Sequence, residues 1–359
     1  MEDLPMSDLF KVKSSIRDYE VHFIDEIVES LKSVIKQGDY IFVDANVSVM
    51  SGIAEFIVDY EKVIRIDAIE QTKSYEGVLP FIEDLIVNGF KKNNRLIAIG
   101  GGITQDVTAF IASILYRGVD WLFFPTTLIA QADSCIGSKT SINFGKYKNQ
   151  LGNFYPPLSV HIDTKILGFL LERDIRSGVG EMAHYFFVSG PSDVEFFESQ
   201  YLTTLNDQSN MQTVVGASLA IKKRYIEIDE FDRNERIVFN YGHTFGHAIE
   251  SITNYNIPHG VSVSFGMDIA NYISMKKGYI SISEFTRAHQ VFKTIWSGYA
   301  IKNISIQELL KAMEKDKKNE NGKMGLILTK GWGKMFRDLT EPDDVFQKWI
   351  KEYFSDYSS

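Results

Sequence analysis

The strongest constraint on the fold is a change of periodicity partway along the chain. In the first half, extended apolar runs recur at residues 40–43, 63–66, 96–99, 121–124 and 159–162. Segments with helical spacing lie between these runs, for example at 78–90 and 107–115. Strands that alternate with helices predict a parallel sheet that is covered on both faces. We therefore expect an α/β domain over residues 1–171.

From about residue 172 the pattern is helical. Apolar residues recur every three or four positions through 175–188, 211–228, 244–252 and 261–274. This spacing is typical of helices that bury one face. It predicts an all-helical C-terminal domain over residues 172–359, in which 325–329 is the one strand-like run.

Composition excludes several classes of protein. Of the 359 residues, 44% are hydrophobic and 24% are charged, which is the balance of a globular chain with a sizeable core. We find no run of 18 apolar residues, and the acidic start is no secretory signal. The single cysteine, Cys135, excludes a disulfide framework and a multi-cysteine zinc site. A net charge of −9 without a basic block argues against nucleic acid as a partner. We expect a cytoplasmic protein without membrane contact.

Three consecutive glycines follow the apolar run at 96–99. Gly100, Gly101 and Gly102 precede a helix start, where backbone N–H groups can bind a phosphate. The pattern lacks the later glycine of GxGxxG, so a plain strand-to-helix turn is the alternative. Asp44 and Asn46 follow the first strand, and Glu70 and Lys73 follow the second. Each could be an ordinary turn residue, but ligands bind where parallel strands end.

The histidines suggest a metal site. His243 and His247 are four residues apart, so that on a helix they share a face, and His259 follows in Pro258-His259-Gly260. Glu181, inside a helical pattern, is the natural carboxylate to complete an open catalytic zinc site. The alternative is a structural pair of helix histidines.

Several cations occur in polar or loop-like sequence despite the acidic composition. Such groups could bind a phosphate and a carboxylate, although most lysines are solvated surface charges. The candidates, with a neighbouring amide, are Lys139, Lys148, Asn149, Lys222, Arg236, Lys317 and Lys318.

Taken together, these motifs resemble the 3-dehydroquinate synthase family of sugar-phosphate cyclases. The matching segments run in family order through most of the chain: GGGITQD (100–106), RGVDWLFFPTTLIAQADSCIGSKT (117–140), KNQLGNFYPP (148–157), ERDIRSGVGE (172–181), DEFDRNERIVFNYGHTFGHAIE (229–250) and HG (259–260). The resemblance implies a Rossmann-like N-terminal domain, a helical C-terminal domain and an active site between them. It also implies a bound NAD that is used and regenerated, a divalent metal (Zn²⁺ or Co²⁺), and a homodimer.

The resemblance also assigns roles to residues. The metal ligands would be Glu181, His243 and His259. Catalytic residues would be His247, Lys139, Asn240 and Arg236, with His247 near the phosphate and available for proton transfer. NAD would contact Asp44, Asn46, Glu70, Lys73, Gly101, Gly102, Asp106, Thr126, Thr127, Asp133 and Lys148. The substrate would contact Lys139, Asn149, Lys222, Arg236, Asn240, His247, Lys317 or Lys318, and Arg117 from the partner subunit.

Two positions depart from the family pattern. His184 stands where the synthases carry a lysine, and Val261 replaces the glutamate of an HGE motif. The first change removes a cation from the substrate side, and the second removes a carboxylate beside a metal ligand. Either could mark an altered choice of substrate.

The leading functional prediction is 3-dehydroquinate synthase, which converts 3-deoxy-D-arabino-heptulosonate 7-phosphate into 3-dehydroquinate and phosphate. Lys139, Lys222 and Arg236 favour it, because they match the cations that hold a substrate carboxylate in these synthases. One alternative is a related cyclase acting on sedoheptulose 7-phosphate or another sugar phosphate. Others are a metal-dependent polyol or glycerol-phosphate dehydrogenase, and a catalytically silent binding protein.

Overall fold

The computed structural model describes residues 9–50, 52–145, 147–301, 304–314, 320 and 322–358. The chain forms two compact units. The N-terminal unit comprises Glu2–Leu170 and Lys222–Phe231, and the C-terminal unit comprises Leu171–Ile221 and Asp232–Ser359. The short segment Lys222–Phe231 therefore belongs to the N-terminal unit, although it follows much later in the sequence.

A seven-stranded sheet forms the centre of the N-terminal unit, in the order β1-β2-β9-β6-β5-β3-β4. All neighbouring strands are parallel except β1 and β2, which confirms the expected parallel α/β sheet. The five predicted strands are β3 (Tyr40–Asp44), β4 (Val63–Ile66), β5 (Leu96–Gly100), β6 (Trp121–Pro125) and β9 (Ser159–Ile162). β3, β5 and β6 are buried along their whole length, as strands covered on both faces must be.

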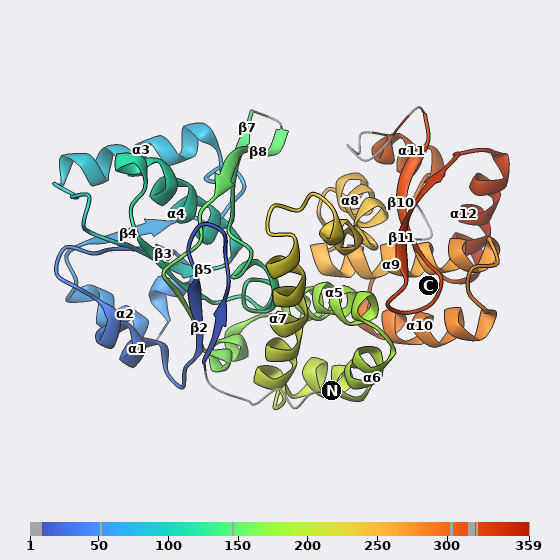
Figure 1. Cartoon of the computed structure of the whole chain (residues 1–359), viewed down its shortest axis with the longest axis horizontal. Coiled ribbons are helices and arrows are strands. Elements are labelled where there is room, and N and C mark those ends of the chain that lie inside the picture. Colours follow the sequence, from blue (N-terminus) through green and yellow to red (C-terminus); the bar gives the residue numbers. More distant parts are fainter. Residues whose placement is uncertain are drawn as a thin grey trace. The chain divides into compact units, whose positions relative to one another are not determined.

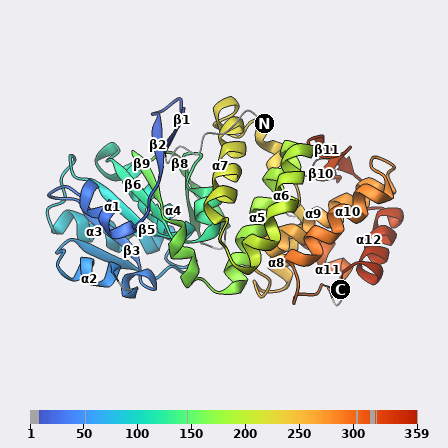
Figure 2. The ribbon, with the colours of Figure 1, turned by 90° about the horizontal axis from the view of Figure 1, so that it is seen from below.

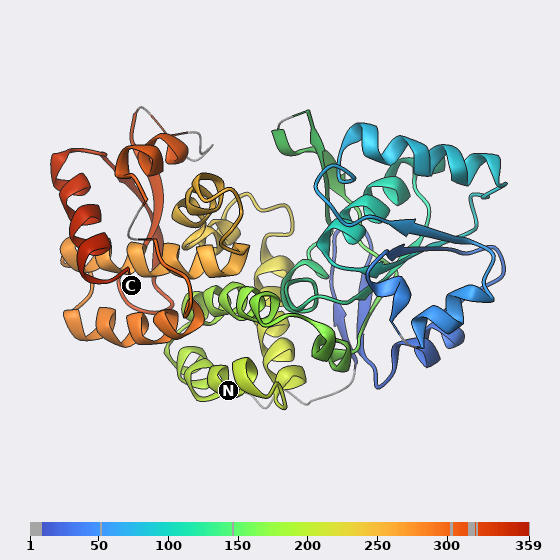
Figure 3. The same ribbon diagram turned by 180° about the vertical axis from the view of Figure 1, so that it is seen from behind.

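Helices cover both faces of this sheet. Figures 1 and 3 show α3 and α4 on one side of the sheet, with α1 and α2 on the other. The helical segments are α1 (Ile27–Val34), α2 (Ile53–Val58), α3 (Tyr75–Val87) and α4 (Gly102–Ile114), with short turns η1 (Val47–Val49), η2 (Leu115–Arg117), η3 (Ala130–Ser134) and η4 (Thr164–Phe169).

Two hairpins of the N-terminal unit were not predicted. β1 (Leu9–Val12) pairs with β2 (Tyr19–Phe23), whose buried and exposed residues alternate and so give no continuous apolar run. β7 (Lys139–Phe144) pairs with β8 (Tyr147–Phe154). The stretch around Lys139 and Asn149, expected to be a loop, is therefore mostly an antiparallel hairpin. Its many exposed polar residues conceal the strand pattern.

The C-terminal unit is largely helical. Its elements are α5 (Glu172–Ser189), α6 (Pro191–Asn206), the first part of α7 (Met211–Ile228), η5 (Glu235–Asn240), α8 (His243–Ile252), α9 (His259–Lys276), α10 (Ile282–Ile295), α11 (Ile306–Met313), β10 (Met324–Thr329), β11 (Met335–Thr340) and α12 (Asp344–Asp356). The expected strand near 325–329 has an antiparallel partner, β11, so that this unit is not all-helical. β11 was missed because its sequence, MFRDLT, mixes charged with apolar residues.

Helix α9 is the core of the C-terminal unit. It packs against α5, α8, α10 and α12, and Figure 2 shows it beside α5 and α10. Every residue from Gly260 to Ser274 is buried. A helix buried on all sides shows only a weak amphipathic pattern, and its neighbours must approach it closely.

Glycines make this close approach possible. A Cβ on Gly260 would lie 1.8 Å from the carbonyl oxygen of Ser177 in α5, and one on Gly180 would lie 2.2 Å from the carbonyl oxygen of Gly260. Likewise, a Cβ on Gly266 would lie 1.9 Å from the carbonyl oxygen of Gly242, next to α8. The backbones of α5 and α8 therefore lie directly against that of α9.

No helix within the described part of the chain is long and apolar enough to span a membrane.

We predict that Gly266→Ala destabilises the protein. Alanine is favoured over glycine in a helix by about 1 kcal/mol. The new methyl group would nevertheless meet a backbone oxygen that cannot rotate away, and overpacking of this kind costs about 1–3 kcal/mol or more. Denaturant unfolding should show a net loss of stability. Gly168→Ala is the control, because a Cβ there meets no atom within 4 Å. Equal stability of the two variants would contradict the close-approach argument.

Candidate active site

Three histidines of the C-terminal unit form a compact cluster. One ring nitrogen from each of His243, His247 and His259 lies within 4.8 Å of the other two. His243 and His247 occupy the first two turns of α8, and His259 is the first residue of α9. The four-residue spacing places the first two on one helix face, as the sequence predicts, and the glycine contacts bring the start of α9 alongside.

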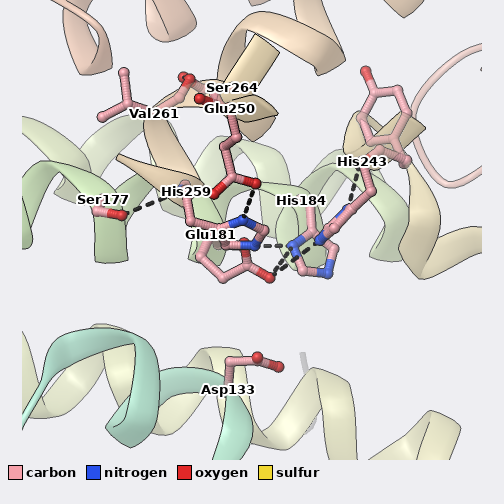
Figure 4. Close-up of polar contacts among 12 residues, drawn as sticks. Asp133, Ser177, Glu181, His184, His243, Glu250, His259, Val261 and Ser264 are labelled. Atoms are coloured by element: carbon pink, nitrogen blue, oxygen red, sulfur yellow. Dashed lines mark hydrogen bonds and ion pairs between the residues drawn. The ribbon is translucent and has the colours of Figure 1, made fainter. Parts of the chain in front are cut away.

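Glu181 of α5 lies against this cluster (Figure 4). Its Oε1 is 3.5 Å from His243 Nε2, and its Oε2 is 3.4 Å from His259 Nε2. The Oε2 atom is buried and accepts no hydrogen bond from any described residue. Burial alone would raise the pKa of Glu181, but the nearby His243 and His184 outweigh it and hold that pKa well below its usual value. A buried carboxylate with an unused oxygen beside imidazole nitrogens fits a metal ligand.

The other nitrogen of two of these rings has its own partner. His243 Nδ1 lies 3.2 Å from the carbonyl oxygen of Tyr241, and His259 Nδ1 lies 2.9 Å from Glu250 Oε2. The Tyr241 hydroxyl in turn donates to Asn271 Oδ1 at 2.5 Å. Burial lowers the pKa of His259, but its contacts with Glu181 and Glu250 prevail and raise it well above the usual value. Both Nε2 atoms thus face Glu181. No role was predicted from the sequence for Glu250, Tyr241 or Asn271.

The two departures from the family pattern lie in different surroundings. His184 is buried beside the cluster, with its Nδ1 2.6 Å from the backbone oxygen of Glu181 and 3.6 Å from Glu181 Oε1. Val261 is buried in the packing of α9, and Figure 4 shows its side chain pointing away from Glu181 and His184. Of the two changes, only His184 touches the carboxylate of the cluster.

A second group of predicted residues gathers where parallel strands of the N-terminal unit end. Asp44 ends β3, and the neighbouring β5 ends at Gly100. Gly101 caps α4, and Gly102 is the first residue of that helix. A Cβ on Gly102 would meet no atom within 4 Å, so open space adjoins the helix N-terminus. The Thr126 amide donates to the Gly100 oxygen, which places Thr126 at the same edge. This arrangement suits a phosphate group.

Asn143 of β7 connects further predicted residues. Its Nδ2 donates to Glu70 Oε2 at 2.8 Å, and its Oδ1 accepts the Asn149 amide at 2.9 Å. Glu70 also lies 3.5 Å from Lys148 Nζ. Asn143 was not predicted, because an amide within an unrecognised strand carries no motif.

Lys73 and Asp106, which are both half-buried, form an ion pair with an Nζ–Oδ2 distance of 2.6 Å. Burial raises the pKa of Asp106, and the lysine offsets part of this rise. Both residues were predicted to contact NAD, and the structure places them together.

Asp133 lies in η3, a short π-helical turn, where Lys222 donates to its backbone oxygen at 2.6 Å and to its Oδ1 at 2.8 Å. Such turns often occur at functional sites. Nearby, Glu230 accepts hydrogen bonds from Ser14, Ser15 and Ser138. Glu230 therefore holds Ser138, the residue that precedes Lys139, in place. Lys139 is exposed.

The remaining predicted residues lie partly in the C-terminal unit and partly in the N-terminal unit. Arg236 is buried in η5, and Asn240 ends η5 with its Nδ2 3.0 Å from the Ile237 oxygen. Arg117 is exposed and has a left-handed backbone with φ of 64°. Asn46 is exposed, and Thr127 follows β6. Lys317 and Lys318 lie outside the described residues.

Comparisons with known families cover most of the chain. Residues 63–177 match the family model described as 3-dehydroquinate synthase N-terminal. Residues 178–319 match the model described as 3-dehydroquinate synthase C-terminal. The 3-dehydroquinate synthase of Dictyoglomus thermophilum is 37% identical over 293 residues, which cover 80% of this chain and 82% of the relative.

Solved structures share the fold. A 2-deoxy-scyllo-inosose synthase complexed with carbaglucose-6-phosphate, NAD⁺ and Co²⁺ superposes with a TM-score of 0.83 at 22% identity, over 96% of this chain and 99% of that chain. ValA, a 2-epi-5-epi-valiolone synthase from Streptomyces hygroscopicus with NAD⁺ and Zn²⁺ bound, gives a TM-score of 0.80 at 22% identity. The superposition covers 95% of this chain and 97% of that chain.

We predict that His243→Ala lowers bound Zn²⁺ well below one ion per chain, because it removes a nitrogen from the centre of the cluster. Elemental analysis after dialysis against a stated Zn²⁺ concentration measures this. His22→Ala removes a histidine from the N-terminal unit and should leave the metal content unchanged. Full metal content in His243→Ala would refute the assignment.

Proposed function

This chain belongs to the 3-dehydroquinate synthase family, and we propose that it converts 3-deoxy-D-arabino-heptulosonate 7-phosphate into 3-dehydroquinate and inorganic phosphate. The observation that carries this proposal is the Glu181–histidine cluster, which lies within the family's motifs. We further propose that the enzyme uses NAD and one Zn²⁺ or Co²⁺ ion.

The residues of the C-terminal unit fit a divalent metal. Glu181, His243 and His259 would hold the metal. The Glu181 carboxylate has a buried oxygen without a hydrogen bond from any described residue, and both imidazoles turn their Nε2 atoms towards this carboxylate. His247 adjoins these ligands and is exposed, so it would hold or transfer a proton at the substrate phosphate. One carboxylate and two imidazoles leave positions open for substrate oxygens.

The residues of the N-terminal unit fit a dinucleotide. The open space at Gly102 adjoins the free N–H groups at the start of α4, where a pyrophosphate would bind. Asp44 is a buried carboxylate at the end of β3, which suits ribose hydroxyl groups. Glu70, Lys73, Asp106 and Lys148 form a polar group connected through Asn143 and would hold the rest of the cofactor.

When bound, NAD would accept and return a hydride, and the metal would polarise the substrate oxygens. The chain's own residues would bind and orient the substrate. Arg236 offers a planar guanidinium that suits a carboxylate, and Lys139 and Lys222 add positive charge. Asn149 and Asn240 supply amide groups for hydroxyl oxygens. Holding a flexible linear substrate in a folded conformation is a large part of what such a site contributes.

Asp133 already engages Lys222 through its backbone and side-chain oxygens. Lys222 would therefore be oriented by Asp133 before substrate arrives. A pre-oriented lysine loses less side-chain entropy on binding a carboxylate than a solvated one.

We also propose a homodimer in which Arg117 of one subunit contacts the phosphate bound by the other. The backbone supports a special role for this residue, because Tyr116 and Arg117 are consecutive left-handed residues with φ of 50° and 64°. Such strain is rare for residues with side chains and is concentrated at functional sites.

A related cyclase that acts on another sugar phosphate is the second candidate, and His184 is the observation that favours it. This imidazole is buried against Glu181, whereas the family's lysine would place a fixed cation towards substrate hydroxyls. A panel that includes sedoheptulose 7-phosphate and glucose 6-phosphate separates the candidates by phosphate release. Net NADH formation matching product would instead indicate a dehydrogenase.

We predict that Arg236→Met lowers kcat/KM for the seven-carbon keto acid phosphate by about 10² or more, which corresponds to roughly 3 kcal/mol for a charged contact. Phosphate release measures the loss. Arg287→Met removes an exposed arginine that pairs with Glu198 and should have little effect. An unmodified enzyme that ignores this substrate but cyclises a neutral sugar phosphate would overturn the substrate assignment.

We predict that Gly102→Val weakens NAD⁺ binding at least tenfold while leaving the fold intact. The valine side chain would enter space free of protein atoms, so that the protein is not overpacked but the pyrophosphate position is filled. Calorimetric titration with NAD⁺ measures the affinity, and thermal unfolding shows whether the fold is intact. Unchanged affinity would remove the nucleotide from this edge of the sheet.

A further inference from the structure

Glu250 shares a helix face with the two histidines of α8. His243, His247 and Glu250 occupy positions separated by four and three residues, which lie above one another on a helix. The Glu250 side chain is 14% exposed, and its Oε2 lies 2.9 Å from His259 Nδ1. It therefore links the last turns of α8 to the first residue of α9.

His259 lies between two carboxylates. Its Nδ1 faces Glu250 and its Nε2 faces Glu181, at 2.9 and 3.4 Å (Figure 4). Turning the ring over would remove both contacts, so Glu250 selects one orientation of the imidazole. His243 Nδ1 instead lies near the backbone oxygen of Tyr241, which is a neutral acceptor.

We propose that Glu250 is a positioning residue for the metal site. Its carboxylate accepts a hydrogen bond from the Nδ1–H group of His259, which would keep the Nε2 lone pair directed at the metal and increase its basicity. Carboxylates commonly act on metal-bound histidines in this way, and their loss typically costs 10- to 100-fold in metal affinity. This inference rests on the proposed metal site.

The proposal also bears on Val261. This residue replaces a family glutamate two positions after His259, and its side chain points away from Glu181. Because Glu250 reaches His259 from α8, the histidine retains a carboxylate partner that does not depend on position 261. The substitution at 261 therefore leaves the metal site with its ligand oriented.

The test compares Zn²⁺ affinities of the full chain by competition with a chelator, for the unmodified protein, Glu250→Gln and Glu250→Ala. We expect Glu250→Ala to bind Zn²⁺ about 10- to 100-fold more weakly. Glu250→Gln should lose less Zn²⁺ affinity, because the amide oxygen still accepts the hydrogen bond from His259 Nδ1–H but carries no charge. Glu172→Gln is the control, since it removes an exposed carboxylate from the helix that carries Glu181. Its affinity should equal that of the unmodified protein.

Two further measurements separate positioning from loss of structure. The metal-free variants should unfold at the same temperature as the metal-free parent protein, and the visible absorption bands of the Co²⁺ form should shift in Glu250→Ala. If Glu250→Ala binds Zn²⁺ within threefold of the parent, the positioning role is wrong although the metal site stands. If His243→Ala also retains Zn²⁺, the metal site itself is wrong.

Discussion

Contact between helix backbones at glycines is the constraint on which the Glu181–histidine cluster, our proposed metal site, depends. Gly180 and Gly260 bring α5 against α9, and Gly242 and Gly266 bring α8 against α9. Each proposed ligand adjoins one of these glycines in sequence: Glu181 follows Gly180, His243 follows Gly242 and His259 precedes Gly260. Side chains whose Cα atoms lie so close to a helix crossing can adopt few conformations. The glycines that close the core thus also set the distances between the proposed ligands, so that a change in this packing would also change the geometry of the cluster.

Sequence reasoning succeeded where one physical cause dominates a short stretch of chain. Strands buried on both faces must be apolar throughout, which is why β3, β5 and β6 were predicted. The shared face of the two α8 histidines followed from helix geometry alone. Strands with many solvent-exposed residues were missed. β2 mixes buried with exposed residues and β8 is exposed along most of its length, so that their sequences resemble polar loops. Contacts such as Glu250 with His259 and Asn143 with Glu70 depend on tertiary placement of elements, which no local pattern records.

The charges of the N-terminal unit show how an acidic chain can receive anionic ligands. The buried Lys222 pairs with Asp133, and the half-buried Lys73 pairs with Asp106. A buried lysine without such a partner would lose its proton or destabilise the fold. The acidic partner lowers the cost of burying the lysine and fixes the direction of its side chain. A net charge of −9 and local sites for anions are therefore compatible.

The composition of the N-terminal unit has a consequence for the order in which a growing chain folds. Lys222 and Glu230 bind Asp133, Ser14 and Ser138, yet they emerge from the ribosome only after residues 171–221 have been made. Domains generally fold as units during synthesis, with the N-terminal one first. Here the sheet can assemble early, but the π-helical turn at Asp133 and the β1–β2 loop wait for a segment that lies beyond much of α7. During synthesis the N-terminal unit therefore stays incomplete while part of the C-terminal unit has already emerged from the ribosome.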